Sequence, residues 1–345
     1  MKHLLFIFWF CIGFIHIGKS QDIHFSQFDY NPMTINPGLT GVFIGDQRAS
    51  ISYKDQWKSF NSSYVTHSFS FDSGLLKKRN NGGWMGAGLN VFRDVAGASK
   101  LGSTKVLLSI SGIVELSRNQ QITAGIQGGI SQNSMSPSEL TWDDQYVGGA
   151  YSTTNPTQEV FAMNPFVYTD LAAGVSWNYT TGSATLSSYD ATRFELGMAI
   201  HHINRPSMKF SNSNERLHRK VIAHGKGNIG IKNSHFMMIP TFMAAFQGPS
   251  KEIVLGCLLR YRLQEASLYT GYFSEMAIAV GTLYRVGDAA IPSVLIEVGS
   301  FALGVSYDVN ISGLNSVSNG KGGIEIVLRF VNPNPFSYGQ GRPSL

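Results

Sequence analysis

The sequence predicts an all-β protein: a transmembrane, antiparallel, up-and-down β-barrel of about 14 strands. Three observations lead to this fold class. Apolar residues recur at every second position over most of the chain, and the charged fraction is only 14%, with 37 glycines. The alternating segments run for about 9–12 residues, the length that a tilted strand needs to cross a bilayer, whereas soluble strands average about five or six. A soluble domain also carries about a quarter charged residues.

The first residues are typical of an export signal. Residues 1–3 form a short basic start, residues 4–17 are an apolar run, and residues 18–20 place small side chains before a cleavage point. This pattern predicts a cleaved signal peptide at 1–20, because the apolar run is too short for a comfortable membrane span. The mature chain then keeps a single cysteine, Cys257, and no intramolecular disulfide is expected.

The mature chain divides into three parts. Residues 21–45 contain Pro32 and Pro37 and lack a clean strand, so we expect a periplasmic or plugging arm. The alternating segments occupy 46–331 and form the outer-membrane barrel. Residues 332–345 form a C-terminal tail.

The alternation is clearest in residues 121–132. Ile122, Ala124 and Ile126 share one face, and Gln121 and Thr123 share the other. The same pattern along the chain predicts strands near 46–55, 63–72, 83–93, 104–115, 119–132, 169–179, 193–202, 217–231, 234–247, 251–262, 274–285, 290–299, 301–310 and 321–331.

A secreted β-sandwich or propeller would also alternate, so the two readings must be compared. The strand length, the export signal and the low charge favour the barrel. In lipid every backbone group must be paired internally, and a closed sheet achieves this. The polar faces carry the mid-strand charges Glu115, Asp170, Arg193, Glu195, Glu325 and Arg329.

These charges either line an aqueous pore or pair across it. Glu115, Glu195 and Glu325 are negatively charged, whereas Arg193 and Arg329 are positively charged. Mixed signs favour pairing, because an unpaired charge in a narrow lumen is costly. We therefore expect a largely occluded barrel.

The connections differ in length. Residues 133–168 form a long connection rich in Ser, Thr, Asn, Gly and Pro, and 203–216 and 311–320 are shorter. Tight turns lie near 116–119 and 285–288. Short turns on one side and long loops on the other are usual for such barrels.

Candidate catalytic and metal residues are few. A lipid hydrolase needs a serine nucleophile beside a base, but His201 has no Gly-x-Ser-x-Gly elbow to accompany it. His201 and His202 are adjacent on a strand, so we expect them to point to opposite faces and not to share a metal. His218 and His224 are expected in the lumen or at a rim. Asp143-Asp144 lacks calcium-loop spacing. The sequence therefore predicts no catalytic, cofactor-binding or metal-binding residues and no cofactor.

Other residue types fit the barrel wall. Gly125, Gly128 and Gly129 precede no helix and so form no phosphate loop; glycines there permit curvature and leave lumen space. Cys257 lies on the apolar face between Leu255 and Leu259, where a redox role is not expected. The aromatics near strand ends are predicted to form interfacial girdles: Trp57, Trp84, Trp177, Tyr179, Tyr261 and Tyr284.

Several short stretches together resemble the PorP/SprF family. The chain reads QDIHFSQF at 21–28, with NP at 31–32 and NPGLTG at 36–41, and continues with YKDQW at 53–57, SFD at 70–72, GAGLNVF at 86–92, HHINRP at 201–206 and SYDVN at 306–310. The resemblance covers nearly the whole mature chain in order. Gly38 stands where the family often has Ala.

The resemblance implies an integral outer-membrane component of type IX secretion and gliding motility in Bacteroidetes. It implies partners among those proteins, such as a peptidoglycan-associated lipoprotein or a secreted adhesin, besides outer-membrane lipid. The mild net charge of +5 does not indicate nucleic acid. We expect a non-enzymatic docking or secretion component. The alternatives are a passive or substrate-selective porin and a lipid hydrolase.

Overall fold

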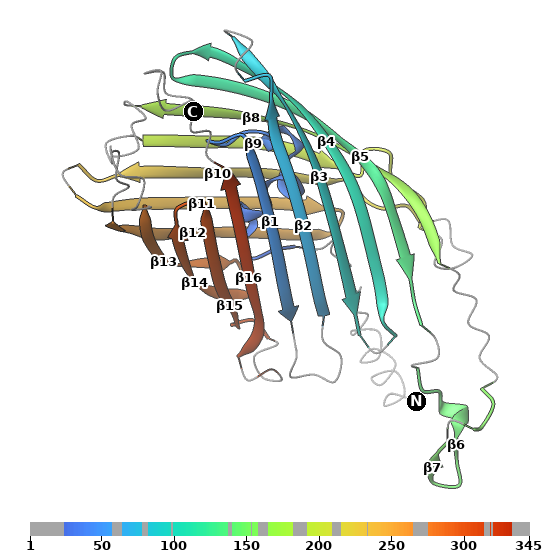
Figure 1. The fold of residues 1–345 in the computed structure, drawn as a ribbon. Helices are drawn as coiled ribbons and strands as arrows, with labels where there is room; N and C mark the ends of the chain where they lie inside the picture. Colours follow the sequence, from blue (N-terminus) through green and yellow to red (C-terminus); the bar gives the residue numbers. More distant parts are fainter. Residues whose placement is uncertain are drawn as a thin grey trace, which may run out of the picture.

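The computed structural model describes residues 24–56, 64–77, 82–97, 99–136, 140–152, 154–157, 165–181, 192–208, 215–232, 234–264, 275–313, 318 and 320–332. Within these ranges, fourteen strands form one closed antiparallel barrel in sequential order (Figure 1). The predicted fold class is confirmed. In the described residues, no helix has the length and apolar character needed to cross a membrane.

The barrel strands match the predicted segments one to one, and their ends differ by at most three residues. They are β1 (Gln47–Gln56), β2 (Tyr64–Leu75), β3 (Gly83–Ala96), β4 (Leu101–Ser117), β5 (Gln120–Ser134), β8 (Phe166–Thr181), β9 (Thr192–His201), β10 (Lys220–Gly230), β11 (Phe236–Gln247), β12 (Ser250–Gln264), β13 (Met276–Arg285), β14 (Ala289–Val298), β15 (Phe301–Asn310) and β16 (Lys321–Asn332).

Two further strands lie outside the barrel. β6 (Tyr146–Val147) and β7 (Ala150–Tyr151) form a small hairpin that stands away from the barrel wall (Figure 1). The hairpin belongs to the connection between β5 and β8. Because β5 ends at Ser134 and β8 begins at Phe166, this connection is shorter than the predicted 133–168.

The ring closes between the first and the last strand. β1 pairs with β16 from Gln47 opposite Asn332 to Gln56 opposite Gly323. No barrel strand among the described residues has a free edge, as a membrane-spanning sheet requires. We call the end where β1 begins and β16 ends the terminal rim. The opposite end, which carries the β5–β8 and β9–β10 connections, is the loop rim.

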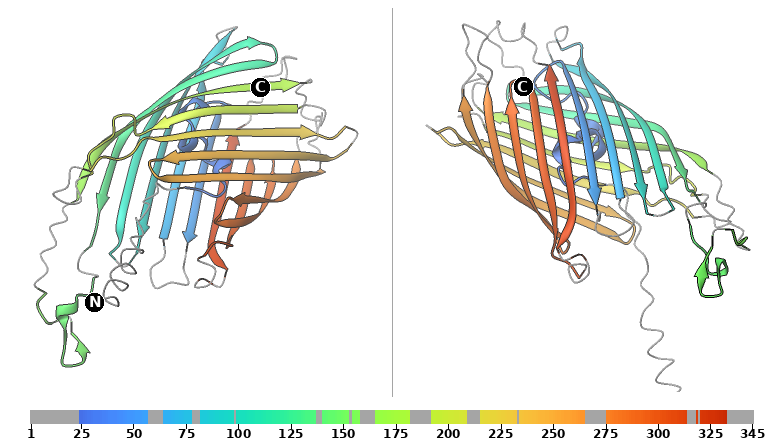
Figure 2. Two further views of the ribbon diagram at one scale, coloured as in Figure 1. Left: turned by 180° about the vertical axis from the view of Figure 1, so that it is seen from behind. Right: turned by 60° about the horizontal axis from the view of Figure 1, so that its bottom comes forward.

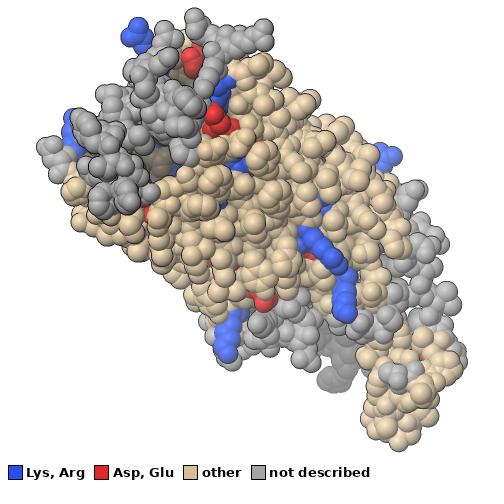
Figure 3. All heavy atoms as spheres, in the orientation of Figure 1, with Lys and Arg blue, Asp and Glu red and all other residues tan. Residues whose placement is uncertain are grey.

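The outer wall is apolar along almost every strand. Leu108, Ile126 and Met198 are 62%, 66% and 58% exposed. Figure 3 shows that the middle of the wall in front is almost free of charged side chains. A surface of this extent is unfavourable in water and favourable against acyl chains.

The inner wall has two different halves. On β1 to β8 the buried side chains are mostly polar, as Ser50 and Thr123 illustrate. On β10 to β15 they are mostly apolar, and Met243, Val254 and Ile291 belong to one packed cluster. The sequence alternation predicted a polar lumen throughout, and this second half was missed. β11 and β12 are apolar on both faces, so their period of two is weak.

Most of the aromatic residues predicted for the girdles face outward. Trp177 stacks on Tyr179 with ring centroids 5.8 Å apart, and Tyr261 and Tyr284 are exposed on the wall. Trp57 lies outside the described residues. For Trp84 the prediction was wrong, because this residue lies on the inward face of β3 and its indole N–H donates to the carbonyl of Gly41.

Cys257 lies in the middle of β12 on its outward face. Its neighbours on that face, Leu255 and Leu259, are exposed on the wall, and the thiol is partly buried and free.

Candidate functional site

The lumen is filled by the segment 24–45, which we call the arm. The arm forms three short helices, η1 (Phe28–Tyr30), α2 (Pro32–Ile35) and η2 (Pro37–Leu39). Two of them begin with proline, whose fixed φ suits the first helical position. Figure 2 shows the arm inside the ring of strands. It runs from a level near the loop rim to the terminal rim, where β1 begins.

Ser26 anchors the start of the arm. Its backbone N–H donates to Glu325 (2.7 Å) and its hydroxyl donates to Asp308 (2.7 Å). The hydroxyl oxygen accepts from Lys54 (3.2 Å) and Arg285 (2.8 Å). A serine hydroxyl has one proton and two lone pairs, so its capacity is fully used. All five residues are buried, and each cation lies beside carboxylates, with Glu252 and Asp288 also 3.4 and 3.0 Å from Arg285.

The next part of the arm joins the two halves of the inner wall. The Asn31 amide donates to Ser52 (2.9 Å), and Ser50 donates to the Tyr30 carbonyl (3.0 Å). On the opposite side, Phe28 belongs to the apolar cluster of β10 to β15. The arm is therefore the packed core of the barrel.

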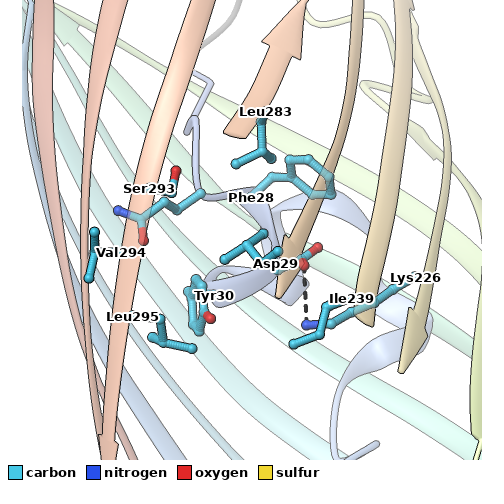
Figure 4. A pocket seen from close by; sticks show the side chains of 11 residues that line it. Phe28, Asp29, Tyr30, Lys226, Ile239, Leu283, Ser293, Val294 and Leu295 are labelled. Carbon is cyan, nitrogen blue, oxygen red and sulfur yellow. Dashed lines mark ion pairs between the residues drawn. The ribbon is translucent and has the colours of Figure 1, made fainter. Parts of the chain in front are cut away.

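Asp29 adds an ion pair to this apolar contact. Its carboxylate lies 3.1 Å from the Lys226 ammonium on β10, and Thr241 donates to it (3.2 Å). Figure 4 shows this pair beside Ile239, with Tyr30 of the arm near Leu295. Lys226 and Arg329 also lie over the Tyr30 ring, at 5.9 and 5.0 Å from its centroid.

The second half of the arm follows β4, β5 and β8. Thr123 donates to the Gly38 carbonyl (2.7 Å), and Ser111 donates to the Thr40 carbonyl (2.6 Å). Two glycines make this approach possible. A Cβ at Gly125 would overlap the Pro37 carbonyl, and one at Gly174 would overlap the Asn36 side chain.

Lys77, in the turn after β2, holds the exit of the arm. Its ammonium donates to the Phe43 carbonyl (3.2 Å) and to the Gly45 carbonyl, and lies 4.7 Å from the centroid of the Phe43 ring. Burial lowers the pKa of Lys77 to about 8, although Asp46 opposes the shift. Arg48 fixes the same region by pairing with Asp72 at 2.7 Å.

Three histidines make polar contacts inside the barrel, and one prediction about them was wrong. The ring of His201 lies 3.0 Å from the Ile35 carbonyl. His202 was expected on the opposite face, but it follows the last residue of β9 and has φ +56°. This left-handed backbone turns its ring inward to Asp170, at 2.9 Å. His224 contacts Asn36 in the lumen (3.0 Å).

The remaining candidate residues lie at the loop rim. His218 is exposed near the start of β10, and Asp143 and Asp144 are exposed in the β5–β8 connection. Within the described residues, no group of three or more His, Cys, Asp or Glu is placed to hold a metal ion.

Three of the predicted lumen charges, Glu195, Glu325 and Arg329, have partners outside that set. Glu325 lies 3.8 Å from Lys54, and Arg329 pairs with Glu297 at 3.3 Å. Glu195 lies 3.7 Å from the ring of His224, and Arg193 lines a lumen cavity of about 490 Å³.

The prediction for Glu115 was wrong, because Glu115 is exposed near the end of β4 instead of lining the lumen. The sequence analysis attributed the occlusion of the lumen to charges that pair across it. In the structure, the arm fills the lumen instead.

The stretches that carry the family resemblance meet around the arm. Ser26 comes from QDIHFSQF, Lys54 from YKDQW, Asp72 from SFD, His201 from HHINRP and Asp308 from SYDVN. Each of these residues contacts the arm or belongs to it. Sequence reasoning named the stretches but not their common contact, which no spacing along the chain reveals.

A closed sheet with an apolar outer wall and an arm inside it defines an outer-membrane β-barrel with an internal plug. The family model described as type IX secretion system membrane protein PorP/SprF matches residues 17–330, so the chain belongs to this family.

Comparison with curated proteins gave no match. Among solved structures, the toluene transporter TbuX of Ralstonia pickettii is similar, with 12% identity and a TM-score of 0.47 over 86% of this chain and 92% of that chain. BamA from Haemophilus ducreyi lacking POTRA domains 1–3 has 9% identity and a TM-score of 0.41 over 83% and 70%. The family assignment rests on the family model, and the fold rests on the strand pairing.

Proposed function

We propose that this chain is a non-enzymatic, integral outer-membrane component of the type IX secretion and gliding machinery. In this role it docks a periplasmic partner or supports secretion of a large surface adhesin. Signal peptide cleavage after residue 20 would expose the segment that leads into the arm.

The filled lumen carries this proposal. Ser26, Asn31 and Gly38 of the arm bond to β-strands on several sides of the ring. A barrel whose interior is occupied by its own buried chain conducts poorly, so we assign the docking function to its surfaces and rims. Membership of a secretion family agrees with such a role.

The main alternative, a passive or substrate-selective porin, predicts a continuous aqueous path. Planar-bilayer recordings of the purified barrel separate the two. We expect no large, stable open currents from the wild-type chain. Sustained ohmic conductance would favour the porin.

Docking is tested by affinity purification from detergent-solubilised outer membranes. The proposal expects a secretion or gliding protein to be retained with the tagged chain in stoichiometric amount, and secretion to fail in cells that lack the chain. Normal secretion without it would contradict the proposal. A lipase assay on the same preparation tests the hydrolase alternative.

A further inference from the structure

A cavity of about 490 Å³ lies between the arm and the terminal rim, and we call it the vestibule. Tyr30 and Leu39 of the arm line its inner end, while Arg48 and Val331 line it at the start of β1 and the end of β16. Beside His201, on the other side of the arm, a cavity measures about 40 Å³, enough for a few water molecules. Of these two lumen cavities, the larger lies at the terminal rim.

One wall of the vestibule is a chain of ion pairs. Arg260 on β12 lies 2.8 Å from Glu275 and 2.6 Å from Glu297, and Glu297 lies 3.3 Å from Arg329 on β16. Each of these side chains keeps 14–27% of its surface exposed. Their carboxylates and guanidiniums are therefore paired and still partly exposed to the vestibule. Figure 3 shows acidic and basic side chains close together at this end.

The arm supplies an apolar wall. Val42, Phe43 and Ile44 line the vestibule and also an adjoining hollow of about 140 Å³ that reaches toward β8. Asn228 on β10 lines both spaces as well. The vestibule thus presents charges of both signs on one side and aliphatic and aromatic surface on another.

This combination restricts the class of ligand. The charged residues that line the vestibule are nearly balanced in sign: Arg48, Arg193, Lys226, Arg260 and Arg329 against Asp29, Glu195, Glu275 and Glu297. A polyanion such as nucleic acid or a lipid phosphate cluster needs an excess of cations. A bare acyl chain would strip these charges of water without replacing it.

A short polypeptide segment meets all of these conditions. It brings backbone donors and acceptors, side chains of both charges, and apolar side chains that pack on an aromatic surface. The volume lies in the range of about 300–1,000 Å³ that holds ligands of this size.

We propose that the vestibule receives a short extended segment of a periplasmic protein partner. An apolar side chain of that segment packs on Phe43, and its polar groups bond to the ion-pair chain of Arg260 and Glu297. The two longest connections between barrel strands, β5–β8 and β9–β10, lie at the opposite rim, and long loops are typical of the extracellular side, so the terminal rim faces the periplasm in this proposal. This inference rests on the docking function proposed above and names the surface that performs it.

The test uses the full-length chain in native outer membranes. In a Cys257→Ala background, Asn228→Cys places a thiol in the vestibule and Asn119→Cys places one at the same rim but outside it. Asn119 is exposed in the β4–β5 turn. Both are labelled with a maleimide-polyethylene glycol reagent, in native membranes and after purification of the barrel alone. A partner segment that occupies the site nine-tenths of the time slows labelling at position 228 about tenfold in native membranes, with no change at position 119.

A bulky substitution gives the second readout. Asn228→Trp should abolish co-purification of the partner while the barrel remains heat-modifiable on gels, and Asn119→Trp should leave co-purification intact. If the partner is retained equally by Asn228→Trp and position 228 labels freely in native membranes, the vestibule is not the docking surface, although the docking function stands. If nothing is retained by the wild-type chain, the docking function fails and this inference fails with it.

Discussion

Ser26 makes four polar contacts with residues of β1, β13, β15 and β16, and each contact uses a different proton or lone pair. The hydroxyl joins Lys54 and Arg285 to Asp308, and the backbone N–H adds Glu325 to the same buried group. The residue therefore stabilises both the barrel seam and the start of the arm.

Replacement of Ser26 by valine is predicted to destabilise the barrel. The change removes the hydroxyl bonds to Asp308, Lys54 and Arg285 and leaves buried groups unsatisfied, at a cost of about 1–3 kcal/mol for each group that finds no new partner. Urea unfolding in detergent, followed by tryptophan fluorescence, measures the loss. Ser134→Ala, at an exposed position of β5, is the control and should have no effect. An unchanged midpoint for Ser26→Val would show that the cluster tolerates the loss.

Lys77 gives a prediction for pH. Its pKa is about 8 in the folded chain, below the ordinary value of 10.5, because of burial. Between these values the folded state binds fewer protons than the unfolded state, so the contribution of Lys77 to stability rises with pH from about 8 to about 10. The wild-type chain should gain free energy of unfolding relative to Lys77→Met across this window. Parallel pH curves for the two chains would contradict the lowered pKa.

At the scale of elements, the arm and the strands fit each other through small residues on the inner face. Gly174 of β8 faces Asn36 of the arm so closely that no Cβ fits between them. The neighbouring Ala173 faces the opposite way, toward the outer wall. A substitution at Gly174 therefore affects both the strand and the docking of the arm, whereas the same substitution at Ala173 affects the strand alone.

Gly174→Leu is predicted to displace the arm without preventing barrel formation. The larger side chain needs the space of Asn36, so the arm should become sensitive to protease and the barrel should begin to conduct. Bilayer recordings and limited proteolysis measure both effects, and heat-modifiability reports the barrel. Ala173→Leu is the matched control and should behave as wild type. Equal behaviour of the two variants would mean that the arm does not close the lumen.

The β5–β8 connection is a second separable element. Gln145 organises it by donating to the Asn155 carbonyl (3.1 Å), and Asn155 returns a bond to the Gln145 carbonyl (3.2 Å). Deletion of 140–157 should therefore leave the barrel heat-modifiable. Impaired secretion in the same variant would assign recognition to this connection. Unaffected secretion would exclude it as the interface.

At the scale of the whole molecule, the chain inverts the usual distribution of side chains. Leu108 and Ile126 are exposed on the outer wall while Lys54 and Glu325 are almost completely buried. The mature chain is therefore predicted to need detergent or lipid to stay folded and dispersed. Sedimentation and circular dichroism with and without detergent check this. A folded, monomeric chain in plain buffer would contradict the membrane-spanning barrel.

The amino-acid sequence by itself determined the fold class, the fourteen strands and their outward faces. Each of these follows from alternation over a few neighbouring residues, because a strand that touches lipid on one side has apolar side chains at every second position. The prediction of inward and outward faces was weaker where this alternation is absent. β11 and β12 are apolar on both faces, and Trp84 looks like a girdle residue until its inward neighbours are known.

The tertiary structure alone decided where the arm lies and which charges meet. Ser26 and Asp308 are 282 positions apart in the chain, yet their side chains are 2.7 Å apart. Such contacts arise when the ring closes and brings β1 beside β16, and no local pattern carries that information. The vestibule has the same origin, because its walls come from the arm and from strands of both ends of the chain.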